Sequence, residues 1–369
     1  MEVLVVKLSA IGDVVHSLPA ISLLKQRVPQ AKITWVVEPL SKDLLLGNPL
    51  VENVVVFEKK KFKSLSANAI KAFAGELKRT KYDYAIDLQG LFKSAAICRG
   101  SGARKIFGFA DAREMAPLMY TDRIKTGDYY SFDEHVVLHN MRLANALANS
   151  ITGKKVDVSD DQALVSAAKF VLPSINDSSI QKIEKHFAEE QAAHGISGSQ
   201  HAPLVVLIPG TTWVTKLWPM PSWAALAEKF AVKGYRVALI GGKGEALANK
   251  ELAESVRKNA PGANLIDITG RTTLVDLMAL FSRARLVVGG DTGPLHLAAA
   301  ISGPAIVGVY GSTPIGRNGP FGTHCSTVST DLDCQPCFSS TCKIATLACL
   351  KELSPDAIFD KSMKAVENA

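Results

Sequence analysis

Short apolar runs alternate with stretches of helical periodicity along the first quarter of the chain. Residues 3–8 are apolar except for Lys7, which is the pattern of a strand buried on both faces of a sheet. Apolar side chains then recur at helical spacing through residues 14–28, and Pro19 marks either a kink or the start of that helix. Further strands are predicted at 32–37, 54–57 and 82–88, and a helix at 69–78. This alternation predicts a parallel sheet covered by helices.

The same alternation restarts near residue 204. Strands are predicted at 204–208, 235–240, 265–267, 286–290 and, as the last of the chain, 305–310, with helices at 221–233, 274–282 and 294–301. The intervening residues are polar, with one predicted helix at 180–193 and a Gly- and Ser-rich linker at 195–199. We expect an α/β fold with two Rossmann-like, doubly wound parallel-sheet domains that face each other across a cleft. The expected bounds are 1–175, a helix and linker region at 176–202, and 203–369.

Length and composition agree with two ordinary globular domains. The chain has 369 residues, of which 47% are hydrophobic and 21% are charged. The apolar run at 3–8 is too short for a signal peptide, and no run approaches the length of a membrane span. We therefore expect a cytoplasmic protein. The net charge of +7 suits an anionic partner and equally suits simple solubility.

The cysteines crowd near the carboxyl terminus, with Cys98 standing apart. The crowded ones are Cys325, Cys334, Cys337, Cys342 and Cys349. A cytosolic chain does not favour a disulfide framework. Only Cys334 and Cys337 have the gap of a metal knuckle, and the complete spacing matches no standard zinc or iron–sulfur pattern. We expect no bound metal and leave the purpose of these cysteines open.

A glycine-rich turn at 289–296 is the strongest local signal for a ligand. A predicted strand ends there and a helix begins, which is where parallel sheets bind phosphates. The N–H groups of Thr292 and Gly293 can donate to phosphate oxygens, and His296 lies on the first helical turn. A helix cap by Asp291 or Thr292 is the alternative. No G-x-G-x-x-G is present in this turn, which argues against a dinucleotide cofactor.

Two more predicted strand ends carry groups that suit the same ligand. Thr211 and Thr212 follow the strand at 204–208, and Lys216 adds a mobile positive charge. Glu245 follows two glycines and can accept hydrogen bonds from ribose hydroxyls. For these residues the alternatives are a surface loop and a helix cap.

The first domain offers a different chemistry at its strand ends. Asp13 follows the small residues Ser9 and Gly12, in a turn where a carboxylate would repel a phosphate. The task of this carboxylate is left open at this point, and a structural cap is one interpretation. Polar and cationic residues near the strand at 82–88 suit an anionic substrate. These are Gln89, Lys93, Arg104 and Arg113.

Taken together, these residues resemble the ADP-heptose:lipopolysaccharide heptosyltransferases, which are inverting glycosyltransferases of the GT-B fold. The resemblance covers nearly the whole chain. It rests on VKLSAIGDVVHSLPA at 6–20, WVVE at 35–38, IDLQGLFKSA at 86–95, PGTTWVTKLWP at 209–219, GGDTGPLHLAAA at 289–300, VGVYGSTP at 307–314 and the cysteine-rich tail. The segments IDLQGLFKSA and GFADARE, at 108–114, are more like the first heptosyltransferase than the second.

The resemblance implies a role for each group of residues. The second domain would bind ADP-heptose through Thr211, Thr212, Lys216, Glu245, Asp291, Thr292, Gly293 and His296. The first domain would bind the anionic Kdo-lipid A acceptor, through Ser9, Gly12, Gln89, Lys93, Arg104 and Arg113. Asp13 would be the catalytic base, and Lys216 would stabilise the departing diphosphate without a metal.

Several partners and rival functions accompany this interpretation. We expect no cofactor, and no nucleic acid, because no helix shows a basic stripe with the spacing of a known module. Peripheral association with the anionic cytoplasmic face of the inner membrane is expected, and the oligomeric state is left open. The rivals are the second heptosyltransferase, a GT-B transferase for another nucleotide sugar, a Rossmann-type epimerase or dehydrogenase, and a non-catalytic lipopolysaccharide- or nucleotide-binding protein.

Overall fold

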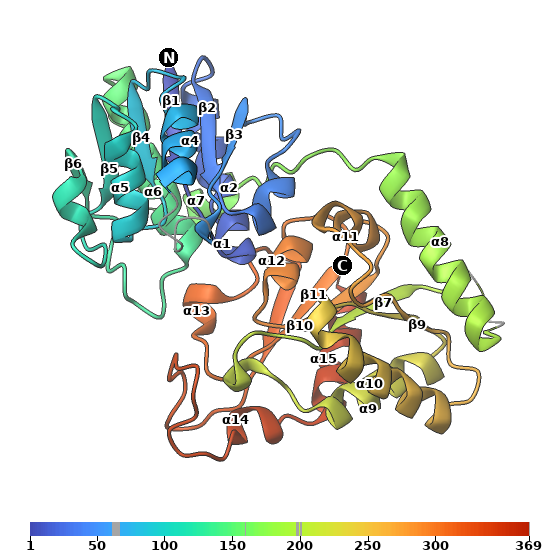
Figure 1. Ribbon diagram of the computed structural model, residues 1–369. Coiled ribbons are helices and arrows are strands. Elements are labelled where there is room, and N and C mark those ends of the chain that lie inside the picture. Colours follow the sequence, from blue (N-terminus) through green and yellow to red (C-terminus); the bar gives the residue numbers. More distant parts are fainter. Residues whose placement is uncertain (61–66, 159, 197–198, 200, 369) are drawn as a thin grey trace. The chain divides into compact units, whose positions relative to one another are not determined.

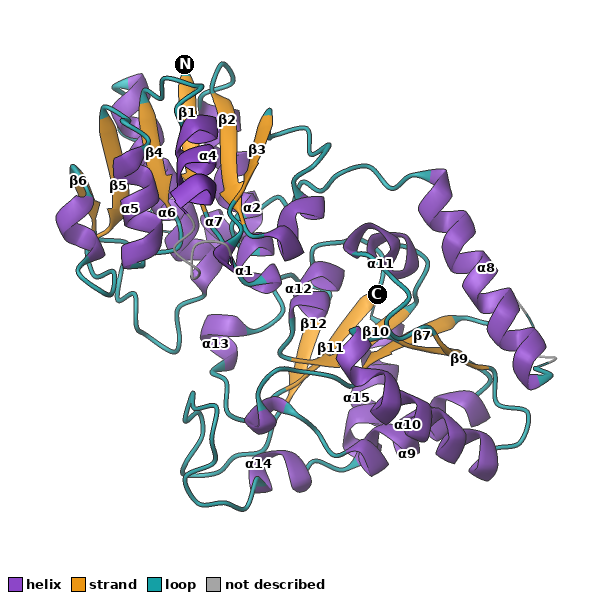
Figure 2. Ribbon diagram, viewed as in Figure 1, coloured by secondary structure: helices purple, strands orange, loops and turns teal. Residues whose placement is uncertain are grey.

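A computed structural model describes residues 1–60, 67–158, 160–196, 199 and 201–368 (Figure 1). Contacts between residues divide the chain into two compact units, Met1–Ser174 and Ile175–Ala369. Each unit carries a six-stranded sheet, and helices flank the strands of both sheets (Figure 2). These parallel sheets confirm the expected α/β fold class.

The first unit is built on a parallel sheet with the strand order β3-β2-β1-β4-β5-β6. Its strands are β1 (Glu2–Val6), β2 (Lys32–Val37), β3 (Asn53–Val56), β4 (Tyr84–Asp87), β5 (Lys105–Phe109) and β6 (Asp122–Ile124). Its helices, with 3-10 helices written η, are α1 (Ile11–Val15), α2 (Leu18–Arg27), η1 (Pro39–Leu44), α4 (Ala67–Leu77), α5 (Phe92–Gly100), η2 (Ala116–Met119), α6 (Val136–Thr152) and α7 (Asp161–Ala167). The central strand β1 is fully buried from Val3 to Val6, because helices cover the sheet.

The second unit repeats this plan with the order β12-β11-β10-β7-β8-β9, again all parallel. Its strands are β7 (Leu204–Ile208), β8 (Arg236–Leu239), β9 (Leu265–Asp267), β10 (Leu286–Gly290), β11 (Ala305–Val309) and β12 (Cys325–Val328). Its helices are α8 (Asp177–His194), η3 (Val214–Lys216), α9 (Met220–Val232), η4 (Lys243–Glu245), α10 (Ala246–Asn259), α11 (Leu274–Phe281), α12 (Gly293–Ala299), α13 (Ile315–Asn318), α14 (Ala348–Lys351) and α15 (Pro355–Glu367).

Both sheets grow in the same way. The first strand of each unit lies inside the sheet, the next two add on one side, and the remaining strands add on the other. The direction of growth reverses between β1 and β4, and between β7 and β10. Open α/β sheets bind their ligands beyond the carboxyl ends of the strands at such a reversal. The loops after these four strands are therefore the places to look for a site.

The structure corrects the predicted elements in three places. β5 and β6 extend the first sheet beyond β4, and β12 extends the second beyond β11, so the strand near 305–310 is not the last. β12 is a half-buried edge strand and therefore lacks an apolar run. The helix predicted at 14–28 is two helices, because Pro19 lies in the first turn of α2, where its missing N–H costs nothing.

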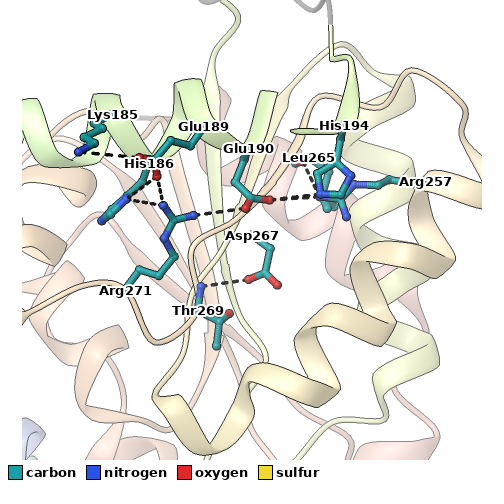
Figure 3. A network of polar contacts seen from close by, with 10 residues as sticks. All are labelled: Lys185, His186, Glu189, Glu190, His194, Arg257, Leu265, Asp267, Thr269 and Arg271. Atoms are coloured by element: carbon teal, nitrogen blue, oxygen red, sulfur yellow. Dashed lines mark hydrogen bonds and ion pairs between the residues drawn. The ribbon is translucent and has the colours of Figure 1, made fainter. Parts of the chain in front are cut away.

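Residues 176–202, expected to be a helix and linker region, contain α8, which belongs to the second unit. Residues 197, 198 and 200 of the expected linker lie outside the described residues. Figure 3 shows side chains of α8 meeting arginines of the second unit. Arg271 forms ion pairs with Glu189 and Glu190, and Arg257 pairs with Glu190 at 3.4 Å. These ion pairs thus hold α8 against the rest of the second unit.

In the described part of the chain, no helix combines the length and the apolar character that a membrane crossing requires. The longest, α8 and α6, have 18 and 17 residues, and polar side chains interrupt both.

Candidate active site

The carboxyl end of β10 is shaped by two glycines that let a neighbouring loop approach. A Cβ atom added to Gly290 would lie 3.2 Å from the carbonyl oxygen of Lys216, and one added to Gly289 would lie 3.0 Å from the Ile208 side chain. A side chain at Gly290 would therefore crowd the loop after β7, and one at Gly289 would crowd Ile208 at the end of β7 itself. The close approach places Lys216 beside Asp291, the first residue after β10.

Asp291 joins a lysine and a histidine in one buried cluster. Its Oδ2 accepts a hydrogen bond from Lys216 Nζ at 2.6 Å, and its Oδ1 lies 2.9 Å from His296 Nε2. Burial would raise the pKa of Asp291, but the hydrogen bond and charge of His296, together with the Lys216 ammonium, hold it down at about 2. The carboxylate is therefore ionised at neutral pH and orients both partners.

Lys216 is also held by an aromatic ring. Its Nζ lies 4.3 Å from the centroid of the Trp213 ring, a cation–π contact. The Lys216 side chain is 15% exposed, so its charge still reaches the surface of the site. A lysine held in this way places a positive charge beyond the carboxyl ends of β7 and β10, where the strand order reverses and an anionic ligand group would bind.

Buried hydroxyl groups without partners follow the same strand and its neighbour. The hydroxyl oxygens of Thr292, Ser312 and Thr313 are buried and have no hydrogen-bond partner among the described residues. Such groups normally hydrogen-bond to something, and here they follow the adjacent strands β10 and β11. Thr292 occupies the N-cap position of α12 without a side-chain cap bond, so the helix-cap alternative does not account for its hydroxyl.

The motif containing Ser312 and Thr313 was part of the recognised pattern, yet its hydroxyls were not predicted as site residues. The signal resembles that of Thr211 and Thr212, since hydroxyl residues follow a strand end in both. Thr211 is half-buried and Thr212 is exposed after β7, at the edge of the sheet where Asp291 lies. Gly293 begins α12 directly after Thr292.

Glu245 lies beside the loop after β7, as a ribose contact would require. Its carboxylate accepts a hydrogen bond from the N–H of Gly242 at 2.5 Å, so it also caps η4. A Cβ atom on Gly210 would come within 1.7 Å of Glu245 Oε1. The absence of a side chain at Gly210 is what lets this carboxylate reach the Thr211 side of the sheet.

The cysteine-rich segment packs against the Lys216 loop. Phe338 lies 6.0 Å, between ring centroids, from Trp213, and the Thr215 hydroxyl donates to the carbonyl of Ser339 at 2.6 Å. Gln335 donates to the Gly311 carbonyl, which ties the segment to the loop after β11. Among the described residues, no three ligating side chains are grouped so that they could hold a metal, and all cysteines are free thiols.

In the first unit, Asp13 lies in the short helix α1 that follows β1, and its carboxylate makes two contacts. Its Oδ2 accepts a hydrogen bond from the N–H of Ala10 at 2.8 Å, which caps α1. Its Oδ1 lies 4.0 Å from Lys7 Nζ, and the side chain is 41% exposed. The cap that sequence alone left as an alternative therefore exists, and it leaves one oxygen facing Lys7. Ser9, between β1 and α1, is half-buried, and Gly12 is buried in α1.

Gln89 holds in place the turn between β1 and α1, which precedes Asp13. Its Oε1 accepts hydrogen bonds from the N–H groups of Leu8 and Ser9, at 3.0 and 3.2 Å. Asp87 holds the Gln89 loop in turn, because it accepts from the Gln89 N–H, the Ser94 hydroxyl and the Tyr120 hydroxyl. Burial raises the pKa of Asp87, and these hydrogen bonds oppose the rise. Gln89 therefore has a structural task that the sequence did not reveal.

The predicted cations of the first unit separate into two places. Lys93 pairs with Glu38 at 2.9 Å, and Arg113 packs on the Tyr130 ring while its N–H donates to the Gly90 carbonyl. Lys93, at the start of α5, and Arg113, in the loop after β5, both follow the carboxyl ends of strands, at the edge of the sheet where Asp13 lies. Arg104 precedes the first residue of β5, at the opposite, amino-terminal edge of the parallel sheet. The structure therefore does not bring Arg104 to the predicted acceptor site.

Comparison with known proteins identifies the family. Residues 70–348 match glycosyltransferase family 9 (heptosyltransferase). Lipopolysaccharide heptosyltransferase 1 of Pseudomonas aeruginosa is 30% identical over 349 residues, which cover 93% of this chain and 87% of that protein. The Escherichia coli K12 protein of the same name is 28% identical over 332 residues, covering 88% and 92%.

A solved structure supports the same assignment. The E. coli heptosyltransferase WaaC, solved with ADP, aligns with a TM-score of 0.73 and 26% identity, covering 99% of this chain and all of that one. This match confirms the GT-B class of the two parallel sheets. The chain belongs to glycosyltransferase family 9, the heptosyltransferases.

Proposed function

We propose that this protein transfers heptose from ADP-L-glycero-β-D-manno-heptose to a Kdo residue of Kdo-lipid A, in lipopolysaccharide inner-core biosynthesis, with inversion at the anomeric carbon. The observation that carries the proposal is the cluster at Asp291, where one carboxylate orients Lys216 and His296 beside buried, unpartnered hydroxyls. The similarity to proteins named lipopolysaccharide heptosyltransferase 1 supports the acceptor. A 26% identical neighbour solved with ADP-2-deoxy-2-fluoro heptose supports the donor.

The second unit would bind the donor. Lys216 would offset the charge of the diphosphate, and the hydroxyls of Thr211, Thr212 and Thr292 would donate to its oxygens. Glu245, beside Gly210, would accept from the ribose hydroxyls. Because Lys216 supplies the positive charge, we propose that no metal or other cofactor takes part. Transfer at an unchanged rate in EDTA is expected, and a rate that fell and returned with a divalent cation would contradict this.

The first unit would supply the base. The acceptor hydroxyl oxygen attacks the anomeric carbon on the face opposite the diphosphate, and its proton passes to an Asp13 carboxylate oxygen. The bond from the anomeric carbon to the phosphate oxygen breaks, and its electron pair leaves with ADP. Lys216 stabilises the charge that develops on this leaving group. Asp13→Asn keeps the size of the side chain and removes the base, so transfer should fall at least ~100-fold.

The acceptor is tested by a transfer assay with ADP-heptose and two acceptors. Kdo-lipid A should be glycosylated, whereas acceptor that already carries the first heptose should not. Transfer only to the heptosylated acceptor would identify a second heptosyltransferase and overturn the proposed acceptor.

The donor is tested by calorimetric titration with ADP, UDP and GDP. ADP should bind, and Lys216→Met should weaken it at least ~10-fold, because a charge-assisted contact is lost. Exposed Lys233 of the second unit, changed to Met, is the matched control. Binding of UDP alone would refute the proposed donor.

A further inference from the structure

Lys7 is a buried lysine at the reversal point of the first sheet. It directly follows β1, and only 3% of the residue is exposed. Its ammonium donates a hydrogen bond to the carbonyl of Leu88, the first residue after β4, at 2.8 Å. Lysine is seldom buried, because removing an ammonium from water is costly unless charge or hydrogen bonds compensate. The buried position of Lys7 therefore raises the question of what its positive charge does.

The ammonium faces the carboxylate that the proposed mechanism uses as a base. Lys7 Nζ lies 4.0 Å from Asp13 Oδ1, while Asp13 Oδ2 is held by the Ala10 N–H. The two contacts fix both ends of the carboxylate group. The Asp13 side chain is 41% exposed, whereas the Lys7 side chain is 4% exposed. A sugar that binds over Asp13 would remove water from the carboxylate but would leave Lys7 in place.

That difference matters when the acceptor arrives. Covering a carboxylate removes the water that had stabilised its charge. A cation already buried behind the carboxylate compensates for the lost water, and its effect is stronger in the drier environment. Two other ionisable pairs among the described residues of this unit are already engaged: Lys93 pairs with Glu38, and Asp87 accepts from Tyr120.

We propose that Lys7 is a positioning residue of the transfer reaction, whose buried ammonium keeps the Asp13 carboxylate oriented and offsets the water that it loses when the acceptor covers it. Lys7 acts through Asp13 and does not touch the acceptor. The inference rests on the proposed function of Asp13 as the base. It adds a specific requirement for charge at a position that hydrophobic patterning alone would assign to the core.

The test is a double-mutant cycle between Lys7→Met and Asp13→Asn, measured as kcat, KM for both substrates and ADP affinity. Lys7→Met should lower kcat at least ~10-fold, a part of what a positioned base contributes, with each KM and the ADP affinity within about twofold. In the Asp13→Asn background, Lys7→Met should change the residual kcat less than about twofold, because coupled residues are not additive.

Further variants separate charge from packing. Lys7→Gln keeps a donor for the Leu88 carbonyl without the charge, and it should resemble Lys7→Met; it replaces Lys7→Met if that variant does not fold. Lys32→Met is the matched control, because Lys32 is an exposed lysine of the same sheet.

The outcomes distinguish the two proposals. A Lys7→Gln variant with kcat within about twofold of the wild type would overturn the role of Lys7 while leaving Asp13 as the base. So would an equal loss in the wild-type and Asp13→Asn backgrounds, since a purely structural lysine acts independently of Asp13. If Asp13→Asn alone kept full activity, the proposed base would fail first.

Discussion

Asp291 gains its function from its surroundings. Its carboxylate is buried, yet Lys216 and His296 make ionisation favourable and hold the pKa at about 2, against an ordinary value of 3.8. One acidic residue therefore sets the direction of two side chains that would contact a diphosphate. The same chemical group in Asp13 is far more exposed and faces a buried lysine. The two carboxylates differ because of their neighbours, which are Lys216 and His296 for Asp291 and Lys7 for Asp13.

The free energy of unfolding of the protein should depend on whether Asp291 is ionised. A carboxyl whose folded pKa is depressed stabilises the fold above its unfolded value, and this contribution is lost as pH falls through the folded value. With the values about 2 and 3.8, the window is roughly pH 4 to 2 and the contribution is about 2 kcal/mol. The gap in unfolding free energy between wild type and Asp291→Asn, measured by urea titration, should therefore narrow on acidification. A gap that is constant from pH 7 to the acid limit would contradict this.

At the scale of elements, the loops after the central strands are positioned by other loops. Gln89 fixes the turn after β1, and the cysteine-rich segment supports the loop after β7 through Phe338 and Ser339. These supports are distant in sequence from the loops they hold. The loops are therefore ordered by tertiary contacts, while the strands before them are ordered by their own apolar pattern.

Removing the Gln89 acceptor should loosen the turn between β1 and α1, which precedes Asp13. In Gln89→Leu, the N–H groups of Leu8 and Ser9 lose their partner, so kcat should fall at least ~10-fold, as misplacement of a reacting group by about 1 Å can cost more than this. ADP affinity should stay unchanged. Gln162→Leu, on exposed α7, is the control. Unchanged kcat in Gln89→Leu would show that the turn holds its conformation without this support.

A methyl group at Gly290 should displace the Lys216 loop. The Cβ atom of Gly290→Ala would lie 3.2 Å from a backbone carbonyl oxygen that can move only with its loop. We expect ADP affinity to fall about 10-fold, since a charge-assisted contact is worth roughly 1.5–3 kcal/mol. Gly75→Ala, on exposed α4 with open space around it, should leave affinity unchanged and favour the helix. Equal ADP affinities for Gly290→Ala and wild type would remove the argument from close approach.

At the scale of the whole molecule, the role of the positive net charge can be tested. The net charge is +7, and the proposed acceptor is an anionic lipid in an anionic membrane leaflet. We expect peripheral binding to vesicles that contain phosphatidylglycerol, measured by sedimentation, and its loss as salt rises from about 0.05 to 0.5 M, because salt screens such attraction. Vesicles of phosphatidylcholine alone are the control. Equal binding to both, or none to either, would contradict a role for the charge.

Much of the fold followed from local pattern. β1, β2, β4, β7, β10 and β11 are apolar runs that read as buried strands, and their order along the chain already implied two parallel sheets. β5, β6 and β12 were not predicted. β6 and β12 are edge strands that are at most half-buried and carry a weak apolar pattern, whereas β5 is an interior strand whose short apolar run was missed. Of the proposed site, Lys216, Asp291 and His296 were predicted from strand ends and family resemblance, and the structure brings them together.

The local sequence pattern did not predict which residues the sheet brings together. Arg104 and Arg113 are near in sequence, yet they lie at opposite edges of the first sheet, because β5 runs between them. Lys7 is the one charged residue in the apolar run at 3–8, and its contacts form only when β4 brings Leu88 to it and α1 brings Asp13. The apolar periodicity of the sequence specifies which side chains are buried, and this information is local. The partner of a buried charge depends on which strands become neighbours, and only the assembled sheet settles that.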